Sequence, residues 1–147
     1  GGEKVIGVLV ITHGHLAEEF LNTVKLIMGK QEKCFSLSLL EGDSIEEFSQ
    51  EIFNKIKEID DGSGVIVITD LFLASPYNQT TLNHKKILDE KIDYRLLTGV
   101  NLPMLLEIFN QRMLESSLDD ICEKAMFSAK AGVKEFTREL SKNKKTK

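Results

Sequence analysis

The stretch Val5–His15, VIGVLVITHGH, decides the fold of this 147-residue chain. Six of its first seven residues are apolar, and most of them are β-branched. A run that is apolar on both faces of the pleat is typical of a strand buried on both sides in a parallel sheet. The run stops at Thr12-His13-Gly14-His15, and a helical pattern begins at Leu16. We therefore expect His13 just past the carboxyl end of a central strand, the edge where ligands bind in open α/β sheets.

Three further strands are predicted, each separated from the next by a helical pattern. Val65–Ile68 is a second continuous apolar run and ends at Thr69-Asp70, whereas Cys34–Leu39 alternates and is typical of an outer strand. Ile92–Leu97 is the last candidate and ends at Thr98-Gly99. This alternation predicts an α/β fold with one domain, in which a doubly wound, mainly parallel sheet has right-handed crossovers. We predict the strand order 2-1-3-4 in chain numbering, which sets the ends of the first and third strands side by side.

Apolar periodicity and capping residues predict the helices between these strands. We expect five helices, at Leu16–Met28, Ser44 to about Ile59, roughly Leu82–Leu88, Asn101 through Phe109, and Ser117 to about Leu140. Ser75-Pro76 pairs a residue type that caps helices with a proline suited to the first helical position. The last helix is expected to bury one face formed by Ile121, Ala125, Ala129, Val133 and Phe136.

Composition indicates a globular protein and argues against several functions. The chain is 41% hydrophobic and 29% charged, and no apolar run approaches the roughly 20 residues that span a bilayer. No signal peptide precedes the first strand, so we expect a cytoplasmic location. The formal net charge of −4 gives no electrostatic case for nucleic-acid binding. Cys34 and Cys122 lack the spacing of metal ligands and are expected to be reduced core thiols.

Both ends of the chain are interpreted as additions to the folded domain. Gly1-Gly2 without a leading methionine indicates a cloning remnant over residues 1–3. Residues 138–147 form a charged, mostly basic tail. A solvated helix end explains this tail, because a helix C-terminus tolerates cations, and a binding element is the alternative.

His13 and Asp70 form a candidate catalytic pair across the expected crevice. A carboxylate that is hydrogen-bonded to one imidazole nitrogen fixes the tautomer and leaves the other nitrogen free as a nucleophile. Gly14 leads into one helix and Ser75 begins another, and helix N-termini bind phosphate. Together these features predict phosphoryl transfer through a phosphohistidine. No Walker-type glycine-rich loop occurs, so a nucleotide is not the evident donor.

The histidines also have plainer interpretations. A lone histidine after a strand, such as His13, is more often a loop residue satisfied by a backbone carbonyl than a catalyst. His13 and His15 resemble a metal pair, but no third ligand of suitable type is near in sequence, so no metal is expected. His84 lies in a polar stretch and is expected to be exposed to solvent.

Three segments resemble the mannose-family enzyme IIA of the bacterial phosphoenolpyruvate-dependent sugar phosphotransferase system. They are ITHGHLAEEFL at 11–21, VITDLFLASPYN at 67–78 and GVNLPMLLEIF at 99–109. The resemblance implies that His13 is phosphorylated and that Asp70 orients its ring. It also implies that Thr12, Gly14 and Ser75 contact the phosphoryl group and that no cofactor is needed.

The same resemblance implies a set of partners. The phosphocarrier HPr donates the phosphoryl group, and an enzyme IIB accepts it and phosphorylates sugar that enters through the membrane subunits IIC and IID. Members of this family form homodimers that exchange a strand, for which Met113–Ser116 is the candidate segment here. The charged tail lacks a Pro/Ala-rich linker into a IIB domain, so a free-standing IIA is expected, and a truncated linker is the alternative interpretation of this tail. The sugar is not encoded, because a IIA domain does not touch it.

Two other functions remain open, and one of them, a regulatory module, is kept open by a departure from the family pattern. The family usually has Gly-Gly before Ser-Pro, where this chain has Leu73-Ala74. If those glycines adopt positive φ, Leu and Ala there are strained. The alternatives are a phosphotransfer subunit that serves dihydroxyacetone kinase and a regulatory module that has lost transfer.

Overall fold

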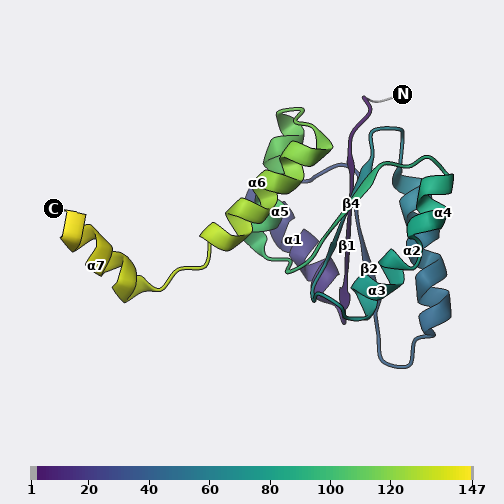
Figure 1. Cartoon of the computed structure of the whole chain (residues 1–147), viewed down its shortest axis with the longest axis horizontal. Helices are drawn as coiled ribbons and strands as arrows, with labels where there is room; N and C mark the ends of the chain where they lie inside the picture. Colours follow the sequence, from purple (N-terminus) through teal and green to yellow (C-terminus); the bar gives the residue numbers. More distant parts are fainter. Residues whose placement is uncertain (1–2, 147) are drawn as a thin grey trace.

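β1 (Gly7–His13) lies at the centre of a four-stranded sheet in this computed structural model, which describes residues 3–146 (Figure 1). β2 (Cys34–Leu39) and β3 (Val65–Thr69) flank it, and β4 (Tyr94–Leu97) pairs with the far side of β3. All pairs are parallel and the order is β2-β1-β3-β4, so the predicted topology is confirmed. The predicted cloning remnant at Gly1-Gly2 and the last residue of the tail lie outside the described residues.

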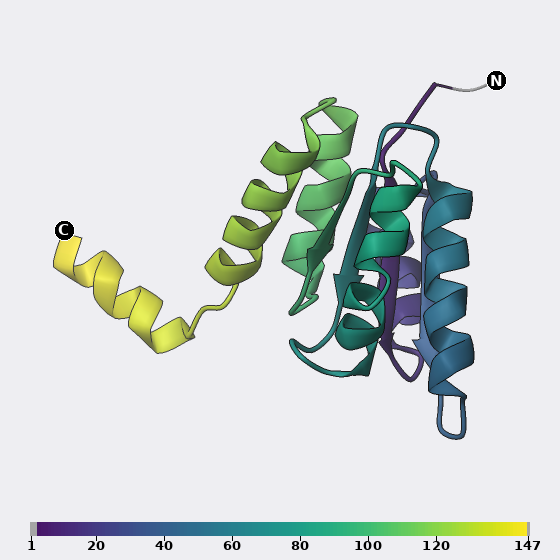
Figure 2. The ribbon, with the colours of Figure 1, turned by 45° about the vertical axis from the view of Figure 1, so that its right-hand side comes forward.

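Helices cover both faces of the sheet, as expected of a doubly wound fold (Figures 1 and 2). One face carries α1 (Leu16–Met28), α5 (Leu102–Met113) and α6 (Leu118–Ala131). The other face carries α2 (Ile45–Ile59), α3 (Ser75–Thr81) and α4 (His84–Asp89). Among the described residues no helix is long and apolar enough to cross a bilayer.

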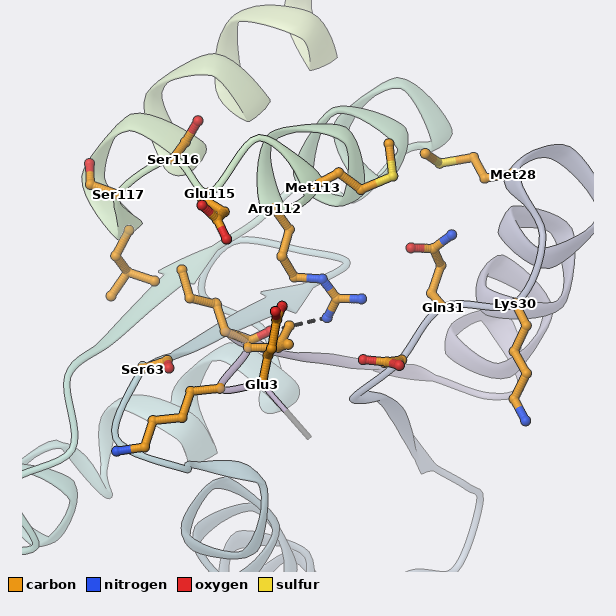
Figure 3. Close-up of a pocket in the computed structure, with 15 residues that line it drawn as sticks. Glu3, Met28, Lys30, Gln31, Ser63, Arg112, Met113, Glu115, Ser116 and Ser117 are labelled. Carbon is orange, nitrogen blue, oxygen red and sulfur yellow. Dashed lines mark hydrogen bonds between the residues drawn. The ribbon is translucent and has the colours of Figure 1, made fainter. Parts of the chain in front are cut away.

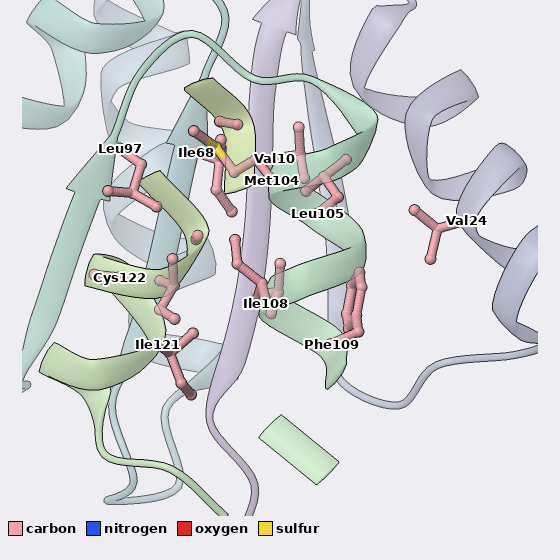
Figure 4. Close-up of a cluster of buried hydrophobic side chains, with 14 of the residues drawn as sticks. Val10, Val24, Ile68, Leu97, Met104, Leu105, Ile108, Phe109, Ile121 and Cys122 are labelled. Carbon is pink, nitrogen blue, oxygen red and sulfur yellow. The ribbon is translucent and has the colours of Figure 1, made fainter. Parts of the chain in front are cut away.

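The apolar run of β1 is continuous because its side chains alternate between two cores. Val8 and Val10 pack into the core under α1, α5 and α6, which Figure 4 shows around Ile108 and Phe109. Leu9 and Ile11 pack into the second core, under α2 and α4. All four of these β1 side chains are 0% exposed. The strand is therefore fixed on both faces, and its carboxyl end has a defined position.

Gly7 lets the start of β1 approach α2 closely. A Cβ atom at this position would lie 2.0 Å from Cγ2 of Ile59.

Three predicted caps fix the starts of other helices. The side chains of Ser44, Asn101 and Ser117 each accept a hydrogen bond from the backbone N–H three residues later, at 3.3, 2.9 and 3.2 Å. These residues satisfy helix amides that would otherwise lack partners.

The single helix predicted near residues 82–88 is wrong in extent. The structure has two short helices, α3 and α4, that meet at Leu82-Asn83. Asn83 is buried at this junction, and its Nδ2 donates to the carbonyl oxygens of Ser49 at 3.0 Å and Gln79 at 2.9 Å. The junction is thus held against α2 by a contact between residues distant in sequence.

The helix predicted from Ser117 to Leu140 is also wrong, because it is broken at Gly132. α6 ends at Ala131, and α7 (Phe136–Thr146) points away from the sheet (Figures 1 and 2). A Cβ atom at Gly132 would lie 2.8 Å from Cγ of Pro103, so the chain passes close to the start of α5. Val133 and Phe136 are exposed, so neither continues the buried face of α6. The charged tail is therefore helical over most of its length.

A cavity of about 770 Å³ opens at the amino end of the sheet, the opposite end from His13 (Figure 3). Arg112 projects into it, donates from Nη1 to the carbonyl oxygen of Ile6 at 3.0 Å, and lies 5.0 Å from the centroid of the Phe109 ring. Burial lowers the pKa of this guanidinium. Arg112 therefore holds the segment that enters β1 against α5.

Met113–Ser116, the predicted exchange segment, is not a strand in this chain. Met113 ends α5, and Glu115 adopts a left-handed backbone with φ of 58°. The N–H of Ser116 donates to the carbonyl oxygen of Gln111 at 3.1 Å. The segment is a closed turn between α5 and α6, because these local hydrogen bonds use the backbone groups that a strand would need.

Candidate active site

His13 is the last residue of β1, whereas the sequence predicts it just past the end of that strand. Its Nδ1 lies 2.8 Å from Oδ2 of Asp70, and its backbone N–H donates to the same oxygen at 2.9 Å. The histidine side chain is 45% exposed, whereas that of Asp70 is 11% exposed. The structure thus brings the two predicted residues together at the carboxyl edge of the sheet.

Asp70 follows β3 directly and accepts hydrogen bonds at both carboxylate oxygens. Its Oδ1 accepts from the N–H of Leu71 at 2.9 Å, while Oδ2 faces His13. Burial acts to raise the pKa of Asp70, but the hydrogen bonds from the backbone and ring of His13 and from Leu71 outweigh it and hold the pKa below its usual value. The carboxylate is therefore ionised at neutral pH.

The pair fixes the tautomer of the imidazole. An ionised carboxylate can only accept, so Nδ1 of His13 carries the ring proton and donates it to Asp70. Nε2 then keeps its lone pair, on a side chain that is 45% exposed. A ring held in this way can attack an electrophile such as phosphorus, and the carboxylate offsets the positive charge that the ring acquires.

Thr12, which is predicted to contact the phosphoryl group, has its side chain buried in the fold. It is 0% exposed, and its Oγ1 accepts a hydrogen bond from the N–H of Ala17 at 2.8 Å. This bond satisfies an amide in the first turn of α1 and ties that helix to the end of β1. Thr12 therefore positions the strand end that carries His13.

Gly14 makes the turn from β1 into α1 with φ of +58°, a conformation that glycine adopts without strain. Its N–H donates to the carbonyl oxygen of Leu39 at 2.8 Å, so this amide is already used within the fold. The neighbouring His15 is exposed, with its Nδ1 3.8 Å from Glu18. The turn thus orients His13, and His15 takes no part in the pair with Asp70.

The sequence predicts Ser75 as the N-cap of a helix, but Ser75 is the first residue of α3. Ala74 occupies the N-cap position, and its carbonyl oxygen accepts from the N–H of Asn78 at 2.8 Å. Within residues 3–146, the half-buried Ser75 side chain has no hydrogen-bond partner. Its hydroxyl is therefore free to bind a ligand.

Leu73 carries the backbone strain that the departure from Gly-Gly predicted, and Ala74 does not. Leu73 has φ of 64°, in the left-handed region, whereas Ala74 is extended with φ of −95°. Nδ2 of Asn78 donates to the carbonyl oxygen of Leu73 at 2.9 Å and holds this conformation. The strain is confined to one residue, three positions after Asp70.

Leu73→Gly is expected to make the protein about 1 kcal/mol more stable to unfolding than Leu73→Ala. Both substitutions remove the exposed leucine side chain. Alanine remains strained at positive φ by about 1–2 kcal/mol, whereas glycine is free of this strain. Part of the advantage of glycine is lost, because glycine has greater conformational freedom in the unfolded chain. Urea denaturation of the two variants measures the difference. Equal midpoints and slopes would contradict strain at this residue.

His84, the remaining histidine, takes no part in the pair of His13 and Asp70. His84 is exposed as predicted, and its Nδ1 lies 2.5 Å from Oη of Tyr94, at the amino end of β4. Within the described residues, no group of three or more His, Cys, Asp or Glu side chains is placed to hold a metal ion.

Comparisons with known proteins point to one family. Residues 7–126 match the family described as the PTS system fructose IIA component. The chain is 29% identical over 129 residues to the mannose-specific EIIAB component of Escherichia coli (strain K12), covering 88% of this chain and 39% of that protein. It is 25% identical over 108 residues to the fructose-specific EIIA component of Bacillus subtilis (strain 168), covering 74% and 71% of the two chains.

A solved structure of a IIA protein is also similar to this chain. The PTS IIA protein associated with the fucose utilization operon of Streptococcus pneumoniae superposes with a TM-score of 0.80 at 26% identity, covering 95% of this chain and 99% of that one. The matched residues include His13 and Asp70, the pair that the fold joins. The chain belongs to the fructose and mannose family of IIA components of the bacterial sugar phosphotransferase system.

Proposed function

We propose that the chain is a phosphocarrier that accepts a phosphoryl group from phospho-HPr on Nε2 of His13 and passes it to an enzyme IIB. The observation that carries this proposal is the 2.8 Å contact between Nδ1 of the half-exposed His13 and the ionised Asp70. The lone pair of Nε2 forms the new bond to phosphorus as the bond from phosphorus to the donor breaks. Asp70 stabilises the positive ring and keeps its Nδ1 proton.

Ser75 is proposed to contact the phosphoryl group, because its hydroxyl has no partner among the described residues and it follows Asp70 by five positions. Thr12 and Gly14 act indirectly, since the side chain of the first and the amide of the second are used within the fold. The reaction so described requires neither a metal nor a nucleotide. The relatives carry the names of sugar systems, which favours sugar uptake over service to dihydroxyacetone kinase.

The proposed setting is cytoplasmic, with the IIB partner delivering phosphate to sugar that enters through membrane subunits IIC and IID. We propose a homodimer in which the segment after α6 of each copy lies against β4 of the other. The outer edge of β4 is unpaired within residues 3–146 and borders a groove of about 510 Å³. Val133 is exposed on this segment and lines the groove. Light scattering should give roughly twice the chain mass of 16.6 kDa, and a monomer would refute the dimer.

The carrier proposal is tested by incubation with phosphoenolpyruvate, enzyme I and HPr. One phosphate per chain is expected, and it should be labile in acid and stable in base, as a phosphohistidine is. Addition of a IIB protein should then remove it. A chain that takes up no phosphate, or a base-labile and acid-stable product, would show that the chain is not a histidine phosphocarrier.

A further inference from the structure

Asn78, in the first turn of α3, makes two hydrogen bonds back to the loop that follows Asp70. Its backbone N–H donates to the carbonyl oxygen of Ala74 at 2.8 Å, and its side-chain Nδ2 donates to the carbonyl oxygen of Leu73 at 2.9 Å. The residue is exposed, so its amide is not needed to fill the core. One residue of the helix thus binds two consecutive carbonyl groups of the loop.

The side chain of Asn78 joins α3 to this loop where a helix cap is missing. Ala74 occupies the N-cap position and has no side-chain group that could accept from the helix amides. Within the described residues, no other side chain of α3 donates a hydrogen bond to residues 71–74. The amide of Asn78 is therefore the polar side-chain link between the start of the helix and the loop.

Leu73 lies in a turn that needs such a link. The N–H of Ala74 donates to the carbonyl oxygen of Leu71 at 3.4 Å, a long hydrogen bond that closes the turn over residues 71–74. We call these four residues the site turn. Leu73 is its third residue and has φ of 64°, at a position where positive φ favours glycine. A strained residue persists only where its surroundings over-determine it, and the 2.9 Å bond from Asn78 supplies that constraint.

The site turn begins and ends at groups of the candidate active site. At its start, the N–H of Leu71 donates to Oδ1 of Asp70 at 2.9 Å, while Oδ2 of the same carboxylate faces Nδ1 of His13. At its end, Ala74 precedes Ser75, whose hydroxyl has no partner among the described residues. A change in the conformation of the site turn therefore moves both the carboxylate and the hydroxyl.

We propose that Asn78 is a positioning residue for phosphoryl transfer, because its side-chain amide holds the site turn and thereby sets Asp70 and Ser75 relative to His13. This inference rests on the proposed phosphocarrier function. Asn78 acts through the backbone of Leu73 and does not touch the phosphoryl group. Its loss should lower the rate of the transfer step and leave the binding of HPr unchanged.

The test compares Asn78→Ala with Gln79→Ala. The first substitution removes the amide that holds Leu73. The second is the matched control, because it removes a side-chain amide one position later that makes no hydrogen bond within the described residues. Each substitution is also made in the Leu73→Gly background, in which glycine adopts φ of 64° without strain and the site turn needs the amide less.

The rate of phosphorylation is measured by rapid quench over a range of phospho-HPr concentrations. Asn78→Ala should lower the maximal rate roughly tenfold, because misplacing reacting groups by about 1 Å costs up to about 100-fold. The phospho-HPr concentration for half-maximal rate should stay within about twofold of the wild-type value, and Gln79→Ala should change neither quantity. In the Leu73→Gly background, Asn78→Ala should cost no more than about threefold, which would show that the two residues are coupled.

A second measurement does not depend on transfer. Nitrogen-15 NMR of the His13 ring in mildly alkaline buffer should place the ring proton on Nδ1 in the wild-type chain and in Gln79→Ala. In Asn78→Ala the ring should exchange between its two tautomers, because Asp70 no longer holds it in one. The Leu73→Gly/Asn78→Ala chain should recover the wild-type spectrum.

Three results would overturn the proposal. An equal loss of rate in the Leu73 and Leu73→Gly backgrounds would show that Asn78 does not act through the site turn. A change confined to the half-maximal phospho-HPr concentration would make Asn78 a contact for HPr, and an unchanged rate and ring spectrum would leave it without a role. Urea unfolding of each variant is the control for folding. If the wild-type chain accepts no phosphate, the phosphocarrier function is refuted, and the ring spectra still decide whether Asn78 positions Asp70.

Discussion

His13→Ala should take up no phosphate from phospho-HPr, whereas His15→Ala should take up one phosphate per chain. The first substitution removes the only histidine held by Asp70 within the described residues, and with it the nucleophile. The second removes an exposed ring two positions away that has no contact with this carboxylate. Intact-mass measurement after incubation with enzyme I, HPr and phosphoenolpyruvate decides between them.

Both variants should fold, because each side chain is substantially exposed. Far-ultraviolet circular dichroism and thermal melting serve as the controls for folding. Undiminished labelling of a folded His13→Ala chain would place the phosphorylated residue elsewhere. Loss of labelling in His15→Ala would show that the two histidines act together.

Asp70→Asn should slow phosphoryl transfer roughly 10- to 150-fold. The substitution removes a charge-assisted hydrogen bond worth about 1.5–3 kcal/mol, which corresponds to that range of rates. Both oxygens of Asp70 accept from N–H groups, so the amide of asparagine must turn its NH₂ group toward Leu71 or toward His13. Rapid-quench measurement of phosphorylation by phospho-HPr gives the rate.

Asp43→Asn is the matched control for this variant. Asp43 lies in the loop before α2 and accepts from the N–H of Leu40 at 2.7 Å, without contact to His13. Its loss removes the same charge near the same edge of the sheet. A wild-type rate in Asp70→Asn, or an equal loss in both variants, would show that Asp70 does not act through the imidazole.

The central strands were predictable because burial on both faces leaves a strong local pattern. β1 and β3 are continuous apolar runs, and their polar ends placed His13 and Asp70 in one crevice once the strand order was chosen. The helix breaks were not predictable, because they depend on contacts between distant residues. Gly132 meets Pro103, and Asn83 meets Ser49.

The site shows the same division between local and long-range information. Residue types and spacing identified the pair, but no pattern could reveal that Thr12 turns its hydroxyl toward Ala17 or that Leu71 holds Asp70. The sequence predicts strain at Leu73 only if the glycine that is usual in the family at this position has a positive φ. Its restriction to Leu73 and not Ala74 required the backbone angles.

The central place of β1 has a consequence for synthesis of the chain on the ribosome. β1 is made first and pairs with β2 after about thirty residues, but its other edge has no partner until β3 (Val65–Thr69) has emerged. An open apolar edge is a template for pairing with other chains. Nascent chains that stall before Thr69 are therefore expected to bind chaperones and to aggregate on release. Chains that extend past β3 close this edge of β1 and are expected to escape this fate.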